Sequence, residues 1–156
     1  GCNALWRDFA PDILFVVDDN MLSEVHNSSY CKVHKVISPC KYVCSEAKII
    51  SIEGKWKKWN CGSLAVLYAC QKNPENVYLA GFDVKYSNGK YKNIYAGTAH
   101  YANQNSVEQQ HVVGAEVNQL TYCFYEYPEI NFYRLYENNI PEWESISNLT
   151  HVTTDI

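Results

Sequence analysis

Residues 59–83, WNCGSLAVLYACQKNPENVYLAGFD, form the stretch that best indicates the fold. Asn60 is a favourable helix N-cap, and the leucines that follow it lie at helical spacing. Pro74 should end this helix, because proline cannot continue one. The apolar run at 77–80 then predicts a short, buried parallel strand. Asp83 would lie beyond the carboxyl end of that strand, where open α/β sheets bind their ligands.

The rest of the chain alternates between strand-like and helix-like patterns. The predicted elements are a strand at 12–18, a helix at 20–25, a strand at 32–37, a helix at 112–125, a strand at 130–136 and a short helix within 140–149. Short strands are also compatible with 42–43 and 48–52, and the final residues are expected to fray. This alternation predicts an α/β fold, a single Rossmann-like domain over residues 1–156 with a mostly parallel sheet and helices on both faces.

The composition favours a globular protein and argues against several other classes of protein. The chain has 156 residues, 47% of them hydrophobic and 14% aromatic, which is typical of one globular domain with a real core. The net charge of -4 argues against a nucleic-acid binder held by a basic surface. No apolar run approaches the roughly 18 residues of a membrane span. The 7 scattered cysteines favour a reduced, cytoplasmic protein over a disulfide scaffold.

The first residues, Gly1 to Leu5, read like the exit of a strand. An α/β sheet normally has its first strand and phosphate-binding turn upstream of such a segment. No initiator methionine is present. We therefore expect an N-terminally truncated chain that lacks its first strand.

The start of the helix after Asn60 is a candidate anion site. A helix N-terminus offers unpaired N–H groups and a favourable dipole, and Gly62 would let a phosphate or sugar approach the backbone. Most capped helices bind nothing, so Asn60 to Ser63 can equally be structural. The segment is not a P-loop, because no Gly-Lys-Ser/Thr follows.

Other candidates lie on loops and strand ends. His100 follows the strand that ends near Asp83 and could act as a general base, although a surface histidine fits as well. Asp18-Asp19 could hold a divalent cation, but helix capping is the favoured interpretation. Tyr78 and Tyr101 could line a sugar or base pocket. The Cys/His spacing between residues 31 and 44 does not match a zinc site, so no metal ligand is predicted.

Several of these segments resemble one family. Asn60-x-Gly-Ser-Leu-Ala together with 77–83 resembles the Ser-Gly-helix-IYLxGxD segment of bacterial sialyltransferases that use CMP-sialic acid. The match is equally close to related hydroxymethylpterin-pyrophosphokinase-like and uncharacterised proteins. Gly1 to Leu5 is similar to the family's second nucleotide-contacting segment, and His100-Tyr101 to the His-Tyr that supplies its catalytic base. The pattern GCNAL-x-RDF-x-PD also resembles uncharacterised proteins of marine bacteria and phages.

The resemblance spans most of the chain and implies a nucleotide-sugar-dependent, glycosyltransferase-like protein. It implies a donor such as a CMP-sugar, direct displacement at the anomeric carbon without a cofactor, and His100 as the base. The other implied site residues are nucleotide-binding Asn3, Asn60, Gly62, Ser63 and Asp83, and substrate-binding Tyr78 and Tyr101. The family's upstream Gly-Asn-Gly-x-Ser loop is absent, and Cys61 replaces a Ser or Thr. A fragment without that loop is expected to be inactive.

Two alternatives stay open. A pterin-type pyrophosphokinase would need Mg²⁺ and would give Asp18, Asp19 or Asp83 a metal role. A non-enzymatic α/β module could instead pair an exposed sheet edge with a second copy and form a homodimer.

Overall fold

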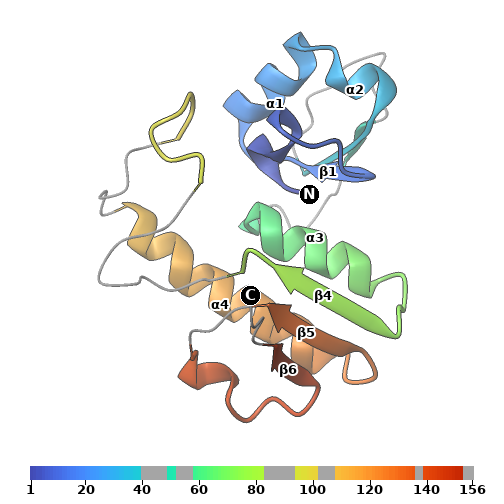
Figure 1. Cartoon of the computed structure of the whole chain (residues 1–156), viewed down its shortest axis with the longest axis vertical. Helices are drawn as coiled ribbons and strands as arrows, with labels where there is room; N and C mark the ends of the chain where they lie inside the picture. The colour runs from blue at the N-terminus through green and yellow to red at the C-terminus, as the bar shows by residue number, and fades with distance from the viewer. Residues whose placement is uncertain (40–48, 52–57, 83–93, 102–107, 136–138, 153–156) are drawn as a thin grey trace. The chain divides into compact units, whose positions relative to one another are not determined.

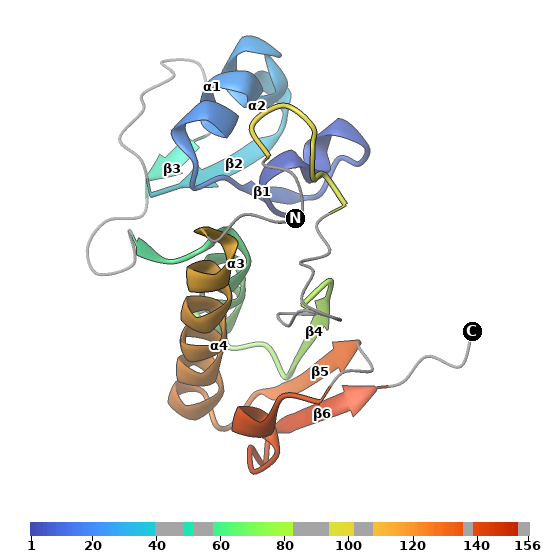
Figure 2. The same ribbon diagram turned by 90° about the vertical axis from the view of Figure 1, so that its left-hand side faces the viewer.

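The computed structural model describes most of the chain as short helices and strands (Figures 1 and 2). The described residues are 1–39, 49–51, 58–82, 94–101, 108–135 and 139–152, the side chains at 49–51 and 108–114 excepted. The chain divides into two compact units, a first unit of residues 1–65 with 98–101 and a second unit of residues 66–97 with 102–156. The single domain expected over residues 1–156 stays a prediction.

The first unit is built around a three-stranded parallel sheet in the order β1-β2-β3. Its strands are β1 (Ile13–Phe15), β2 (Lys35–Ser38) and β3 (Ile49–Ser51). Cys2 forms a parallel bridge with Phe15, and the amino group of Gly1 donates to the carbonyl of Ile13 at 2.8 Å. The chain therefore leaves this sheet at Cys2 as an extended segment, which agrees with the predicted strand exit.

Short helices follow the strand ends of the first unit. The 3₁₀ helix η1 (Asn3–Arg7) follows the Cys2 bridge, and α1 (Asp19–Asn27) and α2 (Tyr30–Val33) connect β1 to β2. Helix α1 includes the predicted helix at 20–25, and it buries Met21, Leu22 and Val25. Because these side chains recur at helical spacing, one face of a short helix suffices to cover the sheet.

Helix α3 (Cys61–Cys70) begins and ends where the local sequence predicts. The side-chain oxygen of Asn60 accepts a hydrogen bond from the backbone N–H of Ser63 at 2.8 Å, which is the N-cap interaction. After the helix, Asn73 adopts a left-handed backbone with φ 49°, and Pro74 prevents a further helical turn.

The second unit contains a three-stranded parallel sheet in the order β4-β5-β6. Its strands are β4 (Asn76–Ala80), β5 (Asn131–Leu135) and β6 (Leu149–Val152). Every strand pair in the described part of the chain is parallel, so the α/β class with a parallel sheet is confirmed.

Helix α4 (Glu108–Glu126) covers one face of the β4-β5-β6 sheet (Figure 2). Its buried side chains include Val117, Leu120 and Phe124, which lie at helical spacing within the predicted helix at 112–125. The ring of Phe124 meets that of Phe132 edge to face, with centroids 4.8 Å apart. Such pairs add to the stabilisation from burial alone.

Strand β4 differs from its prediction. The apolar run at 77–80 indicated a strand covered on both faces, but Tyr78 is 67% exposed while Val77 and Leu79 are buried. Successive side chains of a strand point to opposite faces, so Tyr78 lies on the side away from the core. There it stacks on Tyr133 of β5, with ring centroids 5.1 Å apart.

Strand β6 lies in a region predicted as a short helix followed by frayed residues. The helix is reduced to the 3₁₀ turn η3 (Pro141–Trp143), and residues 149–152 pair with β5. The side chain of Asn148 donates to the carbonyls of Phe124, Tyr127 and Ile130, which places β6 beside β5. None of the helices in the described part of the chain is long and apolar enough to cross a membrane.

Candidate functional site

Most residues implicated by the sequence belong to the first unit. These are Asn3, Asn60, Gly62, Ser63, His100 and Tyr101. Tyr78 belongs to the second unit, and Asp83 lies outside the described residues. Within the first unit, the N-terminal segment contacts the segment 98–101. The backbone N–H of Ala4 donates to the hydroxyl of Tyr101 at 3.4 Å, although 97 positions separate the two residues in sequence.

Asn3 is held against the end of β1. Its backbone is left-handed, with φ 45°, a conformation that asparagine tolerates better than most residues. Its side-chain amide donates to Asp18 Oδ2 at 3.0 Å, and its Oδ1 accepts from the N–H of Val17 at 3.5 Å. The amide of Asn3 is thus oriented by the residues that leave the strand.

Asp18 does not perform the capping role that was favoured for the Asp18-Asp19 pair. Helix α1 begins at Asp19, and the N-cap residue Asp18 makes no side-chain capping hydrogen bond. Its carboxylate accepts from Asn3 instead, because Asn3 approaches from a distant segment that the local sequence does not reveal. Burial raises the pKa of Asp18; the hydrogen bond from Asn3 opposes this rise, and the charge of Asp19 adds to it.

Cys61 links the start of α3 to both Asn3 and β1. Its buried thiol donates to the carbonyl of Phe15 at 2.7 Å and is also hydrogen-bonded to Cys2. Burial, then the contact with Cys2, raises the pKa of Cys61 well above its usual value, while the backbone N–H of Asn3 opposes the shift. Burial and the raised pKa keep this thiol protonated, which favours a structural role over that of a nucleophile.

The first turn of α3 contains a buried hydroxyl, that of Ser63, which makes no hydrogen bond to the described residues. Ser63 is completely buried, and its Oγ has no hydrogen-bond partner within the described residues. By contrast, the side-chain oxygen of Asn60 already accepts from the backbone N–H of Ser63, which confirms the predicted N-cap. A buried hydroxyl without a partner is costly, so the Ser63 hydroxyl is a candidate to bind a ligand.

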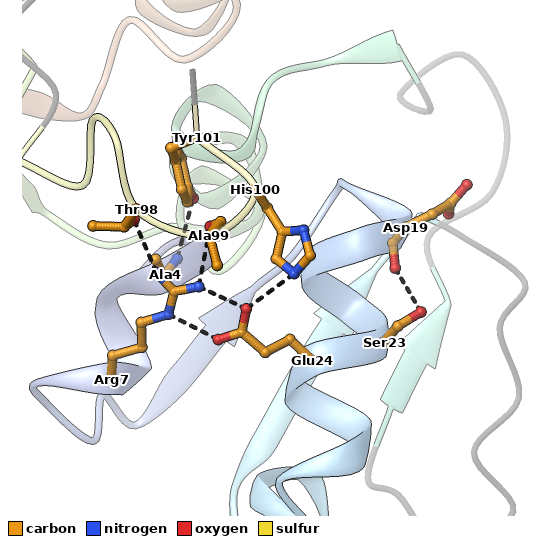
Figure 3. Close-up of polar contacts among 9 residues, drawn as sticks. All are labelled: Ala4, Arg7, Asp19, Ser23, Glu24, Thr98, Ala99, His100 and Tyr101. Carbon is orange, nitrogen blue, oxygen red and sulfur yellow. Dashed lines mark hydrogen bonds and ion pairs between the residues drawn. The ribbon is translucent and has the colours of Figure 1, made fainter. Parts of the chain in front are cut away.

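Arg7 and Glu24 hold the segment Thr98–Tyr101 in the first unit, as Figure 3 shows. Arg7 donates to both carboxylate oxygens of Glu24, from Nε at 2.8 Å and from Nη2 at 2.6 Å. It also donates to Thr98 Oγ1 at 3.1 Å and to the carbonyl of Ala99 at 3.2 Å. We call this set of contacts the Arg7 clasp.

His100 sits on the Arg7 clasp in a strained backbone conformation. Its φ is 68°, in the left-handed region that few non-glycine residues occupy. Its Nε2 lies 3.3 Å from Glu24 Oε2, and its side chain is 37% exposed. Strained residues persist where several contacts hold them, and such positions cluster at functional sites.

Neither Arg7 nor Glu24 was identified from the sequence. Arg7 lies in the quoted pattern GCNAL-x-RDF-x-PD, which could have singled it out. Glu24 carries no such signal, because it occupies an ordinary polar position of a short helix. Pairing between residues 7, 24 and 98–100 arises only when the chain folds.

The hydrogen bond from Arg7 is the main reason that the pKa of Glu24 lies below its ordinary value. Burial opposes this shift, and the charges of Arg7 and His100 support it. Glu24 is therefore ionised at neutral pH.

Glu24→Gln is expected to reduce the stability of the first unit by about 1 kcal/mol at neutral pH, because a partly exposed charge pair is lost. The pKa of Glu24 is lower in the folded protein than its ordinary value of 4.5. Its ion pair therefore stabilises the folded state fully above pH 4.5, and this stabilisation is lost as the pH falls through the pKa of the folded state. Thermal melts of wild type and variant between about pH 3 and 7 should therefore converge at the acidic end. A constant difference across that range would contradict the ion-pair account.

Tyr101 completes the site as a neutral phenol. Burial raises its pKa to about 12, with the charges of Asp18 and Cys61 adding to the effect and the N–H of Ala4 opposing it. The hydroxyl of Tyr101 therefore keeps its proton at neutral pH and can donate a hydrogen bond.

The chain matches no known protein-family model, and no curated protein or solved structure is significantly similar to it. Among the residues that the structure describes, no group of three or more His, Cys, Asp or Glu side chains is placed to hold a metal ion. The arrangement itself combines a partly exposed histidine beside a carboxylate, a neutral tyrosine, an oriented asparagine and a buried serine hydroxyl. These groups suit proton transfer and hydroxyl or phosphate recognition.

Proposed function

We propose that the chain is a nucleotide-sugar-dependent, glycosyltransferase-like protein, similar to the sialyltransferases, with its site in the first unit. One observation carries this proposal. The predicted catalytic segment, His100-Tyr101, belongs to the same compact unit as Asn3 and the start of α3, and the Ala4–Tyr101 hydrogen bond joins this segment to η1. Several residues that the resemblance links to one reaction therefore belong to one compact unit, which supports the proposal.

In this proposal the nucleotide and phosphate lie against Asn3 and the first turn of α3. The oriented amide of Asn3 and the buried hydroxyl of Ser63 supply hydrogen bonds. The helix N-terminus adds a favourable dipole, and Gly62 allows close approach to the backbone.

The chemistry is a direct displacement. The acceptor hydroxyl loses its proton to His100 while its oxygen forms a bond to the anomeric carbon of the donor sugar. The bond from that carbon to the phosphate oxygen breaks, and the nucleotide leaves with the electron pair. Hydrogen bonds from N–H groups at the start of α3 and from hydroxyl groups stabilise the negative charge on the leaving phosphate. No covalent nucleophile is needed, which suits the neutral Cys61 thiol.

A donor such as a CMP-sugar and a cytoplasmic location are part of the proposal. Buried cysteines support a reducing compartment, since Cys70 and Cys123 hydrogen bond to each other as thiols in the second unit. Disulfides are rare in cytoplasmic proteins.

The test is a nucleotide panel followed by NMR on the ¹⁵N-labelled chain. CMP, UMP, GMP and ATP are each added with and without Mg²⁺. CMP without Mg²⁺ is expected to shift the amide signals of Asn3, Gly62 and Ser63, and to leave Tyr133 of the second unit unchanged. A strict requirement for Mg²⁺ would favour the pyrophosphokinase alternative. An absence of shifts with every nucleotide, both in this chain and in a form extended upstream of Gly1, would reject both enzymes.

Ser63→Ala sharpens this test because it removes the buried hydroxyl and keeps the backbone N–H that Asn60 caps. It is expected to weaken CMP binding about tenfold, the effect of one lost hydrogen bond. Ser23→Ala is the matched control, since the Ser23 hydroxyl only donates to the carbonyl of Asp19 within α1. Equal affinity in both variants would remove Ser63 from the site.

A further inference from the structure

The two ring nitrogens of His100 have different surroundings (Figure 3). Nε2 lies 3.3 Å from Glu24 Oε2. Nδ1 has no hydrogen-bond partner within the described part of the chain, and the side chain is 37% exposed. In a neutral imidazole one nitrogen carries a proton and the other a lone pair, so these surroundings decide which nitrogen can accept a proton.

Electrostatics favours the proton on the nitrogen that faces Glu24. Glu24 is ionised, because Arg7 donates to both of its carboxylate oxygens and lowers its pKa. A lone pair on Nε2 would face a negatively charged oxygen and be repelled, whereas an Nε2–H would be attracted to it. The same carboxylate would stabilise the ring after it takes up a second proton.

The backbone around His100 is held on both sides, which keeps the ring at Glu24. Before it, Arg7 donates to Thr98 Oγ1 and to the carbonyl of Ala99. After it, the hydroxyl of Tyr101 accepts from the N–H of Ala4, and the N–H of Tyr101 closes a turn to the carbonyl of Thr98 at 3.0 Å. Reorienting the ring by moving the backbone would therefore break several of these bonds.

We infer that Glu24 is a positioning residue that holds neutral His100 with its proton on Nε2, so that Nδ1 is the atom that accepts a proton. The inference rests on the proposed function only in giving Nδ1 the acceptor hydroxyl as its proton source. In that step the hydroxyl proton moves to Nδ1, and the positive charge of the ring is balanced by Glu24 through Nε2–H. Arg7 acts one step further out by holding the Glu24 carboxylate in place.

The tautomer can be measured without substrate. In the histidine-¹⁵N-labelled chain at about pH 9, where ordinary imidazoles are neutral, two-bond and three-bond ¹H–¹⁵N correlations identify the protonated nitrogen. For His100 we expect Nε2–H alone, and in Glu24→Ala we expect Nδ1–H to become clearly populated. Asp19→Asn is the matched control, because it removes a carboxylate from the same helix and should leave the His100 tautomer unchanged.

Two results would overturn the inference. One is Nδ1–H as the main form in the wild-type chain, which needs no variant and so does not depend on whether Glu24→Ala folds. The other is a tautomer ratio in folded Glu24→Ala that equals that of the wild type. Either can occur whether or not the nucleotide panel succeeds, so failure of this inference is distinct from failure of the proposed function.

A kinetic readout connects the tautomer to turnover once a donor is known. Glu24→Ala is expected to lower kcat at least tenfold while changing KM much less, since the positioned base acts in the chemical step. If kcat stays unchanged and kcat/KM falls only because KM rises, Glu24 acts in substrate binding and the positioning role is contradicted.

Discussion

In a form of the protein that turns over a nucleotide-sugar donor, His100→Ala is expected to lower that turnover by about 10²–10⁴-fold, the usual contribution of a general base. The reason is the geometry of the site, in which His100 is partly exposed beside Glu24 and held in a left-handed conformation. Removal of the imidazole leaves Asn3, Ser63 and Tyr101 in place. The affinity for the nucleotide, measured from the NMR shift of the Ser63 amide signal, should therefore change little.

The control for His100→Ala is His34→Ala, another histidine of the first unit. The His34 ring stacks on Tyr30 with centroids 4.1 Å apart, so its loss tests a structural histidine. Both variants are compared by steady-state turnover after their melting temperatures are checked. If His100→Ala keeps wild-type turnover, His100 is not the base and the proposed mechanism fails.

Trp143→Ala is expected to destabilise the second unit by about 3–5 kcal/mol, the range for truncating a large buried aromatic residue. Trp143 is 1% exposed, and its ring meets that of Phe124 edge to face at 5.4 Å between centroids. Its indole N–H donates to Thr121 Oγ1 at 2.8 Å, and the guanidinium carbon of Arg134 lies 5.3 Å from its ring centroid. The substitution would leave a cavity and remove all three contacts.

Urea denaturation followed by circular dichroism measures this loss. Tyr125→Ala on α4 is the matched control, because the Tyr125 side chain is 66% exposed and its removal should cost less than about 0.5 kcal/mol. Trp143→Phe should fall between the two, since it keeps an aromatic ring and loses the hydrogen bond to Thr121. A loss below about 1 kcal/mol for Trp143→Ala would show that the second unit does not depend on this core.

Much of the fold follows from short stretches of sequence. Helix α3 starts at an asparagine cap and stops before Pro74, and both signals act through the backbone of their own neighbours. Helix α4 is predicted by an apolar stripe that recurs at helical spacing. Strands β1 and β5 lie within the stretches predicted as strands. Strand β2 begins at Lys35, three residues later than predicted, because Tyr30–Val33 form helix α2. These features are local, so one sequence suffices to find them.

Other features depend on distant contacts and were missed or wrongly predicted. Strand β6 has little apolar character of its own and forms because Asn148 and β5 provide hydrogen bonds. Tyr78 looked buried in an apolar run, yet only alternate residues of β4 face the core. The Asp18-Asp19 pair was expected to cap the helix, but the carboxylate of Asp18 accepts from the amide of Asn3 instead.

The sequence from Trp59 to Phe82 by itself determined the helix–turn–strand unit that the structure contains, since capping, proline and apolar spacing are properties of adjacent residues. It also singled out Asn3, Ser63 and His100, but it could not bring them together. Only the tertiary structure placed Thr98–Tyr101 on Arg7 and Glu24 and tied Cys61 to the end of β1. The physical reason is that such contacts depend on the path of the whole chain, because charge pairs and buried hydrogen bonds act over a few ångströms of space irrespective of the residues between them.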